Sequence, residues 1–211
     1  MRITSLKVVL PIFCIAAALA MSPMASADSI TFNLSANNLG ISGTIGTVTI
    51  ADAGSNQVDV TISMNTGFSV KLNGGDIAFN GPTGLSLSSV SNLSAALTGG
   101  GSFSGLDFQQ LRTSQNISMF GTFAFDFANV QGQGGGVVSA DTVTFTLTAT
   151  GLSASQFTGV GLHFCTASGS NCSDITGFAT VVPEPGSLGL MGTGLVGIGG
   201  LIRRRLLSKT A

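Results

Sequence analysis

The residues of this chain that could carry chemistry are few, and their spacing favours a structural role. His163 is the one histidine, and Cys165 and Cys172 follow it closely. A nucleophilic mechanism would need His163 beside an activated serine or cysteine, yet no Gly-x-Ser-x-Gly turn is present. A zinc site would need His163 and both cysteines, at a spacing that is not typical of zinc sites. We therefore expect no catalytic residue, no metal and no cofactor.

Cys165 and Cys172 are the cysteines that remain once the first residues of the chain are removed. An even pair in an exported protein favours a disulfide, which would close the short loop between them. Two alternatives stay open at this point. The pair could remain as free thiols, or it could bind a metal together with His163 and Asp174.

Paired carboxylates are the other chemistry to weigh, because two acids across a sugar ring can hydrolyse a glycoside. The chain has no glutamate before Glu184. Asp52 with Asp59, and Asp126 with Asp141, are pairs only in the sense that any two aspartates are. No calcium-binding loop of the EF-hand pattern is present. The sequence therefore predicts that the protein is not an enzyme, with a glycoside hydrolase as the last-ranked alternative.

Charge is distributed unevenly along the chain. Between residues 28 and 184 there are nine acidic residues and two basic ones, Lys71 and Arg112, a net charge of −7. The remaining basic residues lie at the two ends. A body that is acidic cannot neutralise phosphates, so the sequence argues against a nucleic-acid partner.

The first 27 residues have the three parts of a secretory signal peptide. Two basic residues precede an apolar run from Val8 to Ala20, and small residues follow at Ala25 and Ala27. This order predicts cleavage by signal peptidase before Asp28 and export through the inner membrane. The apolar run is short for a retained membrane helix, which is the alternative.

The other end of the chain predicts a membrane anchor. Pro183-Glu184-Pro185 precedes an uncharged stretch over residues 186–202, and Arg203-Arg204-Arg205 follows directly. Seventeen helical residues cover about 25 Å, enough for a thin bilayer core. The arginines should stay on the cytoplasmic side. We expect a transmembrane helix over 186–202, a basic end over 203–211, and transient residence in the inner membrane.

This order of Pro-Glu-Pro, apolar Gly-rich helix and arginine cluster resembles the PEP-CTERM sorting signal. The resemblance implies recognition, and expected cleavage, by an exosortase-type processing enzyme. It also implies a place at the cell surface or in an extracellular matrix of biofilm and exopolysaccharide. Residues 181–211 form the predicted sorting tail, with the motif at 183–185. A plain tail anchor is the alternative.

The body over residues 28–180 has the period-two alternation of β-strands. Apolar residues alternate with polar ones from Val58 to Met64 and from Val143 to Ala149, and a third run extends from Ile117 through Met119 to Phe127. Asn73-Gly74 predicts a hairpin turn. Frequent glycine and threonine argue against helices. We expect eight to eleven short strands in an all-β antiparallel sandwich or jelly roll.

The alternation also bears on function, because it leaves one polar face on each strand. The chain has no tryptophan and no tyrosine, so an aromatic sugar-binding cleft is not supported. The leading hypothesis is a structural or adhesive protein of the cell surface or extracellular matrix, with matrix polysaccharide as a candidate partner. The alternative is a module of the envelope that binds polysaccharide or calcium.

Overall fold

The computed structural model describes residues 28–97, 101–117, 119–132, 139–166, 172 and 175–181. They form an all-β domain in which every paired strand is antiparallel, as the alternation predicts. Two short 3-10 helices, η1 (Leu87–Ser89) and η2 (Ala154–Gln156), interrupt the strands. The strands are β1 Ser29–Asn37, β2 Gly46–Gly54, β3 Gln57–Met64, β4 Ser69–Lys71, β5 Asp76–Asn80, β6 Val90–Ala96, β7 Ser102–Ser104, β8 Leu106–Ile117, β9 Gly121–Gly132, β10 Ser139–Ala140, β11 Thr142–Thr148, β12 Gly159–Cys165 and β13 Thr176–Val181.

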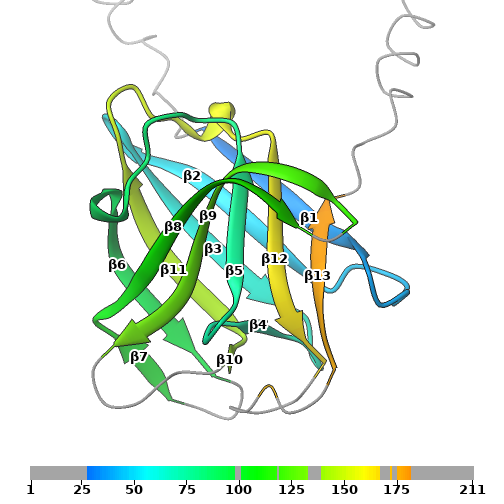
Figure 1. Cartoon of the computed structure of the whole chain (residues 1–211). Helices are drawn as coiled ribbons and strands as arrows, with labels where there is room; N and C mark the ends of the chain where they lie inside the picture. The colour runs from blue at the N-terminus through cyan, green and yellow to red at the C-terminus, as the bar shows by residue number, and fades with distance from the viewer. Residues whose placement is uncertain are drawn as a thin grey trace, which may run out of the picture.

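The described strands number 13, more than the predicted eight to eleven, and they belong to one continuous sheet. Its order is β7-β6-β11-β3-β2-β1-β13-β12-β5-β9-β8; off this path β4 pairs with β12, and β10 pairs with β4. The sheet folds over on itself into a nearly closed sandwich. In Figure 1, β5, β9 and β12 lie in front of β2, β3 and β11. The first and last strands of the chain, β1 and β13, are therefore neighbours in the middle of the sheet.

A phenylalanine-rich core fills the space between the two layers. Phe79 of β5 packs edge-on against Phe145 of β11 and Phe157, with ring centroids 6.3 Å and 5.6 Å apart. Phe108 of β8 contacts the same Phe145 at 5.4 Å. Large aromatic side chains contribute more burial per residue than aliphatic ones. The inward positions of the alternating strands thus meet across the sandwich, as period two requires.

The predicted hairpin at Asn73-Gly74 is wrong. β4 and β5 do not pair with each other; both pair with the same edge of β12, end to end. The residues between them leave the sheet as a loop opposite His163 and return. This loop is held by β9, whose Asn129 side chain accepts a hydrogen bond of 3.1 Å from the Gly74 backbone N–H. Local turn residues could not reveal that both strands pair with a third strand, β12, instead of with each other.

The β8–β9 hairpin is longer than the strand beside it. β9 pairs with β5 only from Phe125 to Ala128, so the tip of the hairpin extends past the end of β5. It bends back over the outer face of β5, β12 and β13, as Figure 1 shows. Met119 lies at this tip and is 82% exposed, so its predicted place inside a period-two strand is wrong.

Both described ends of the domain lie at one end of the sandwich. Leu34 of β1 is paired with Val181, the last residue of β13, and the two strands run in opposite directions. The predicted signal-cleavage point before Asp28 and the predicted sorting motif at 183–185 therefore adjoin the same end of the domain. Export and sorting would both act there.

Candidate functional site

Most residues of the predicted processing signals lie outside the described part of the chain. This holds for Ala25, Ala27 and Pro183-Glu184-Pro185, and equally for Arg203-Arg204-Arg205. Asp28 is described: it is exposed, and its backbone carbonyl accepts a hydrogen bond of 2.8 Å from the Asp52 N–H. The expected signal cleavage would thus leave a mature end that is already attached to β2.

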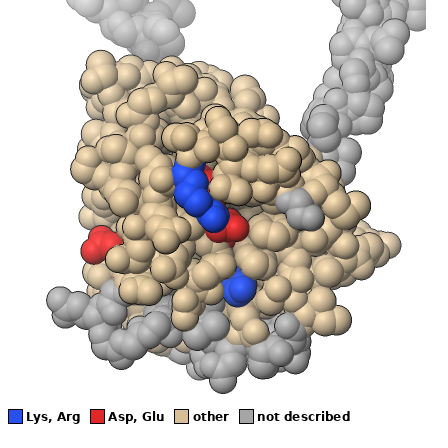
Figure 2. Space-filling model, in the orientation of Figure 1, with Lys and Arg blue, Asp and Glu red and all other residues tan. Residues whose placement is uncertain are grey.

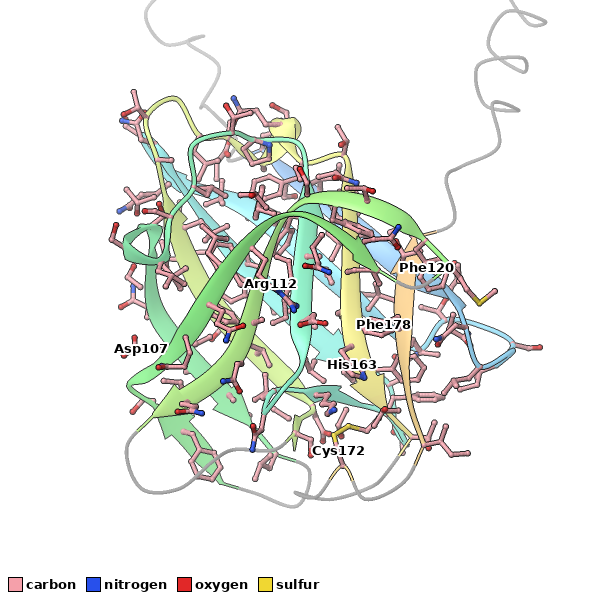
Figure 3. The ribbon with its side chains drawn as sticks, viewed as in Figure 1. Asp107, Arg112, Phe120, His163, Cys172 and Phe178 are labelled. Carbon is pink, nitrogen blue, oxygen red and sulfur yellow. A yellow bond between two sulfur atoms is a disulfide. The ribbon has the colours of Figure 1, made fainter. Side chains whose placement is uncertain are left out.

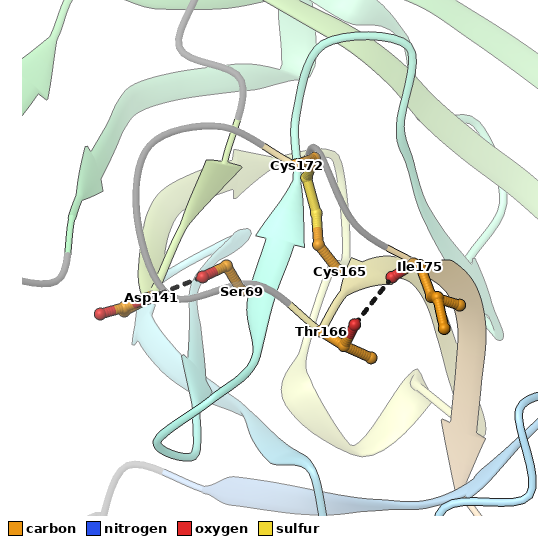
Figure 4. The surroundings of a disulfide bond; sticks show 6 residues. All are labelled: Ser69, Asp141, Cys165, Thr166, Cys172 and Ile175. Carbon is orange, nitrogen blue, oxygen red and sulfur yellow. Dashed lines mark hydrogen bonds between the residues drawn. A yellow bond between two sulfur atoms is a disulfide. The ribbon is translucent and has the colours of Figure 1, made fainter.

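The structure joins Cys165 and Cys172 in a disulfide, with their Cα atoms 5.5 Å apart. Cys165 is fully buried at the end of β12. Beside it, the Thr166 side chain and backbone both donate hydrogen bonds to the Ile175 carbonyl (Figure 4). The disulfide and these bonds fasten the β12–β13 connection. The free-thiol and metal-site alternatives do not describe this pair.

His163 is a packing residue in the middle of β12. Its ring stacks on Phe178 of β13 with centroids 4.3 Å apart, and the two side chains lie side by side in Figure 3. Burial, together with the positive charge of Lys71, lowers the pKa of His163 to about 4. The imidazole is therefore neutral at physiological pH, and its buried Nδ1 has no hydrogen-bond partner among the described residues.

A group of three charged residues lies on the same face, and sequence reasoning missed it. Arg112 of β8 donates hydrogen bonds to Asp126 of β9 and Asp76 of β5, with Nε and Asp126 Oδ2 2.8 Å apart. Figure 2 shows a basic group in contact with an acidic one near the middle of a face that carries few other charges. We call Asp76, Arg112 and Asp126 the charge triad. It links three adjacent strands.

Burial controls the electrostatics of the charge triad. The Asp126 side chain is fully buried, and desolvation raises its pKa to about 6, with a further contribution from the negative charge of Asp76. Asp76 is less buried, and desolvation raises its pKa as well, against the opposing effect of Arg112. Within the part of the chain that the structure describes, Asp126 Oδ1 has no hydrogen-bond partner. A carboxylate enclosed in this way cannot reach a substrate, so the triad is built for holding strands together.

One signal in the sequence could have pointed to the charge triad. Asp126 stands between Phe125 and Phe127, and Arg112 is one of only two basic residues in the body. A strand register with Arg112 opposite Asp126 would have joined them. That register depends on where the β8–β9 turn lies, which the sequence pattern alone placed wrongly.

The tip of the β8–β9 hairpin, residues 115–117 and 119–123, forms a flap over the outer face. Ile117 and Phe123 of the flap are buried against Ala78, with Phe120 and Phe178 packed around them. A Cβ on Gly161 of β12 would lie 2.8 Å from the Phe123 ring, so only glycine leaves room for it. The outer face beneath the flap is thus apolar, unlike the outward face of an ordinary exposed sheet.

A groove of about 410 Å³ opens along the edge of the flap. Met119, Phe120 and Phe123 form one wall, and the ends of β5, β12 and β13 form the other. Phe120 lies near the end of β13 in Figure 3. Thr180 and Val181, the last described residues of the body, line this groove.

On the opposite layer, the outward side chains of β1, β2, β3, β11, β6 and β7 form a surface rich in hydroxyl groups, the hydroxyl face. Strand register aligns six hydroxyl residues in one row across neighbouring strands. The row is Thr31, Thr49, Thr61, Thr144, Ser94 and Ser104. Hydrogen bonds of 3.1 Å join Thr31 to Thr49 and Ser94 to Thr144.

A second row of the hydroxyl face runs beside the first, with Asn33, Thr47, Ser63 and Thr142 in register. On the other side of the first row, Asp59 of β3 is paired with Thr146 of β11. The Thr146 hydroxyl donates a hydrogen bond of 2.7 Å to the Asp59 carboxylate. Neighbouring strands lie about 4.8 Å apart, and residues two apart on one strand about 6.7 Å. The hydroxyls thus form a two-dimensional array.

A shallow hollow of about 280 Å³ interrupts the hydroxyl face. It lies where the register of β6 shifts against β11, and Asn92 there has a φ of 55°. Asn92 Nδ2 donates to the Thr146 hydroxyl at 3.3 Å. Asp59, Thr61 and Thr144 also line the hollow, which therefore has polar walls on several sides.

The described residues contain neither a metal-binding cluster nor a membrane-spanning helix. In that part of the chain no group of three or more His, Cys, Asp or Glu could hold a metal ion. The same residues contain no helix long and apolar enough to cross a membrane. The predicted span over 186–202 lies outside them.

Comparison with known proteins gives one match. The family model described as the PEP-CTERM protein-sorting motif matches residues 181–205. The resemblance found in the Pro-Glu-Pro tail is thereby confirmed, and the motif begins at the last residue of β13. No curated protein and no solved structure matches the chain. The match implies an exported protein that an exosortase sorts to the cell surface.

Proposed function

We propose that this exported, exosortase-sorted protein is a structural or adhesive component of the cell surface and its extracellular matrix. Its hydroxyl face is the proposed contact, and neutral polysaccharide is the proposed ligand. The observation that carries the proposal is the row of six hydroxyl residues in register across six strands. The matrix location and the ligand are both part of the proposal.

The chemistry of the hydroxyl face suits a ligand that is itself covered with hydroxyl groups. Each Ser or Thr hydroxyl both donates and accepts, so it can pair with sugar hydroxyls in either direction. Among the aligned rows the charged member is Asp59, whose carboxylate already accepts the Thr146 hydroxyl. A body of net charge −7 repels acidic polymers, which favours a neutral one.

The expected binding is weak at each site and adds up over many sites. The chain offers no tryptophan or tyrosine on which a sugar ring could stack. Exchange of protein–water for protein–sugar hydrogen bonds contributes only about 1 kcal/mol each. A repeating polymer can engage several rows, and several proteins can bind one polymer, so avidity supplies retention. This is the behaviour of a matrix component.

Catalysis is not part of the proposal. Of the described carboxylates, Asp76 and Asp126 are joined through Arg112, and Asp126 is fully buried. A glycosidase needs two carboxylates that face an open substrate site. We expect neither the wild type nor the Asp126→Asn variant to hydrolyse a polysaccharide. Release of reducing ends by the wild type but not by the variant would show a catalytic role for Asp126 and contradict this expectation.

The binding proposal is tested by replacing threonines with valines of the same shape. The triple variant Thr49→Val, Thr61→Val and Thr144→Val removes three hydroxyls from the central row while keeping β-branched side chains. We expect it to lose most of its co-sedimentation with cellulose, used as an insoluble neutral polysaccharide. The matched control changes three exposed threonines elsewhere, Thr83, Thr113 and Thr122. It should bind like the wild type, and equal loss in both triples would contradict the proposal.

The sorting step has its own test. Intact mass of the protein released from its native host should show a chain that begins at Asp28 and ends near residue 185. The control carries Pro183→Gly and Pro185→Gly, which remove the motif. A released wild-type chain that still contains Arg203 to Arg205 would contradict removal of the tail.

A further inference from the structure

The groove beside the flap is open, yet it lies where the body meets the sorting motif. Thr180 and Val181 line it, and the Pro-Glu-Pro sequence begins two residues after Val181. The chain cannot leave β13 without starting from this groove. A segment attached at the rim of a site has a high effective concentration there, in the millimolar range for short linkers.

The walls of the groove have the composition that proline-rich segments bind. Phe120, which is partly exposed, supplies aromatic surface backed by the buried Phe123, and Met119 adds a flexible apolar side chain that is 82% exposed. Grooves lined by aromatic residues bind proline-rich segments in other proteins, because the polyproline conformation is already formed before binding. Little conformational entropy is then lost on docking.

The dimensions of the groove agree with this occupant. The three residues of Pro183-Glu184-Pro185 extend about 9 Å in the polyproline conformation. A groove of about 410 Å³ falls in the ordinary range for a small ligand. Proline in general favours extended backbone in the residue before it.

We propose that the groove between the flap and the end of β13 binds the Pro-Glu-Pro segment of the same chain. The folded body would then hold the motif in one extended conformation and shield it until the sorting enzyme displaces it. The flap would couple folding to sorting, because the groove exists only when β5, β9, β12 and β13 are assembled. The inference rests on the sorting motif and does not depend on the hydroxyl face.

Because the chain has no tryptophan, the fluorescence of a single introduced tryptophan reports on this groove alone. Met119→Trp places one tryptophan at the exposed rim, where it should not disturb folding. The full chain is made in a host without the sorting enzyme, so that every molecule keeps its tail, and it is purified in detergent. Acrylamide quenching is compared with that of the same chain carrying Pro183→Gly and Pro185→Gly.

A seated motif should lower the quenching constant by a factor of about two relative to the glycine chain, since half or more of the tails would cover the tryptophan. Its emission should also move to shorter wavelength. Leu87→Trp, at an exposed position in η1, should show no difference between the two tails. Equal quenching of the Met119→Trp chains would overturn the proposal, while processing in the native host would still show whether sorting itself occurs.

Discussion

The two layers of this sandwich share one alternating pattern but use it differently. On the hydroxyl face, residues such as Thr49 and Thr61 point outward while Ile50 and Val60 fill the core. On the flap-covered layer, burial occurs on both sides of the sheet. Ile77 packs into the main core, and Ala78, its neighbour in sequence, is buried beneath Phe123 and Ile117.

The two layers should therefore differ in how well they tolerate substitution of their side chains. Outward threonines on the hydroxyl face can be exchanged without leaving a void or an unpaired charge, so their chemistry is available for binding. On the flap-covered layer, Asp126 is fully buried and a Cβ on Gly161 would meet the Phe123 ring. Stability changes should therefore concentrate on one layer and binding changes on the other.

Removal of Arg112 should give the largest effect on stability. Arg112→Ala leaves the buried Asp126 beside Asp76 without a cation; loss of one partner of a buried pair costs about 3 kcal/mol, and solvent screening at the partly exposed Arg112 makes that an upper value. The free energy of unfolding is measured in urea by circular dichroism, because the chain has no tryptophan or tyrosine. Thr61→Val on the hydroxyl face is the comparison and should change stability by less than about 0.5 kcal/mol.

A double variant sharpens that prediction. Arg112→Met with Asp126→Leu removes both charges and fills the space with apolar atoms, so it should recover most of the lost stability. If the double variant were as unstable as Arg112→Ala, packing rather than the unpaired carboxylate would be the cause.

Loss of the disulfide should give the next largest effect. Cys165→Ser with Cys172→Ser opens a loop of only a few residues, and the loop-entropy relation gives about 2 kcal/mol for such a loop. The melting temperature of the oxidised wild type should therefore fall in the variant and in a reducing agent alike. If the melting temperature of the wild type were the same with and without the reducing agent, the disulfide would contribute nothing to stability.

The flap should respond to a single methyl group. Gly161→Ala places a Cβ 2.8 Å from the Phe123 ring and should cost about 1–3 kcal/mol through overpacking. Gly159→Ala, on the same strand, is the matched control, because its Cβ would meet nothing closer than 3.6 Å. Similar losses for both variants would mean that the flap does not rest on Gly161.

The pH dependence of stability should be small, because two groups oppose each other. The pKa of Asp126 is raised to about 6 from 3.8, so acidification from pH 6 to 3.8 stabilises the folded domain. The raised pKa of Asp76 acts in the same direction. The pKa of His163 is lowered to about 4 from 6.5, so acidification from pH 6.5 to 4 destabilises it.

Single variants separate the two titrations. Asp126→Asn should lose stability as the pH falls from 6.5 to 4, because the effect of His163 is then less opposed. His163→Phe keeps a ring against Phe178, and this variant should become more stable as the pH falls from 6 to 3.8. Urea midpoints across this range measure both, and parallel curves for the wild type and the two variants would refute the assignment.

Regular parts of the fold could be predicted from sequence. The alternations at Val58–Met64 and Val143–Ala149 became β3 and β11, which are direct neighbours in the sheet. There each strand has one buried and one solvated face, so the period-two alternation is enough to predict both the strand and its orientation. The disulfide was predicted for a similar reason, since two cysteines leave one pairing.

The flap-covered layer could not be predicted in the same way. Asn73-Gly74 looked like a hairpin turn, but β12 accepts both flanking strands along one edge. Met119 continued an apolar alternation, although a turn places it in solvent. The charge triad joins the β8–β9 hairpin to β5, which η1, β6 and β7 separate from it in the chain. The pairing of β4 and β5 with β12 and the joining of the triad depend on nonlocal contacts, which no local pattern contains.

The most direct test of the central claim is retention of the mature protein in the matrix of its native host. Cells producing the wild type, the hydroxyl-face triple variant or the control triple variant are washed, and the protein left in the matrix is compared with the protein in the wash. We predict that the wild type and the control stay in the matrix while the hydroxyl-face variant, processed normally, appears in the wash. Equal retention of all three would contradict a matrix role carried by the hydroxyl face.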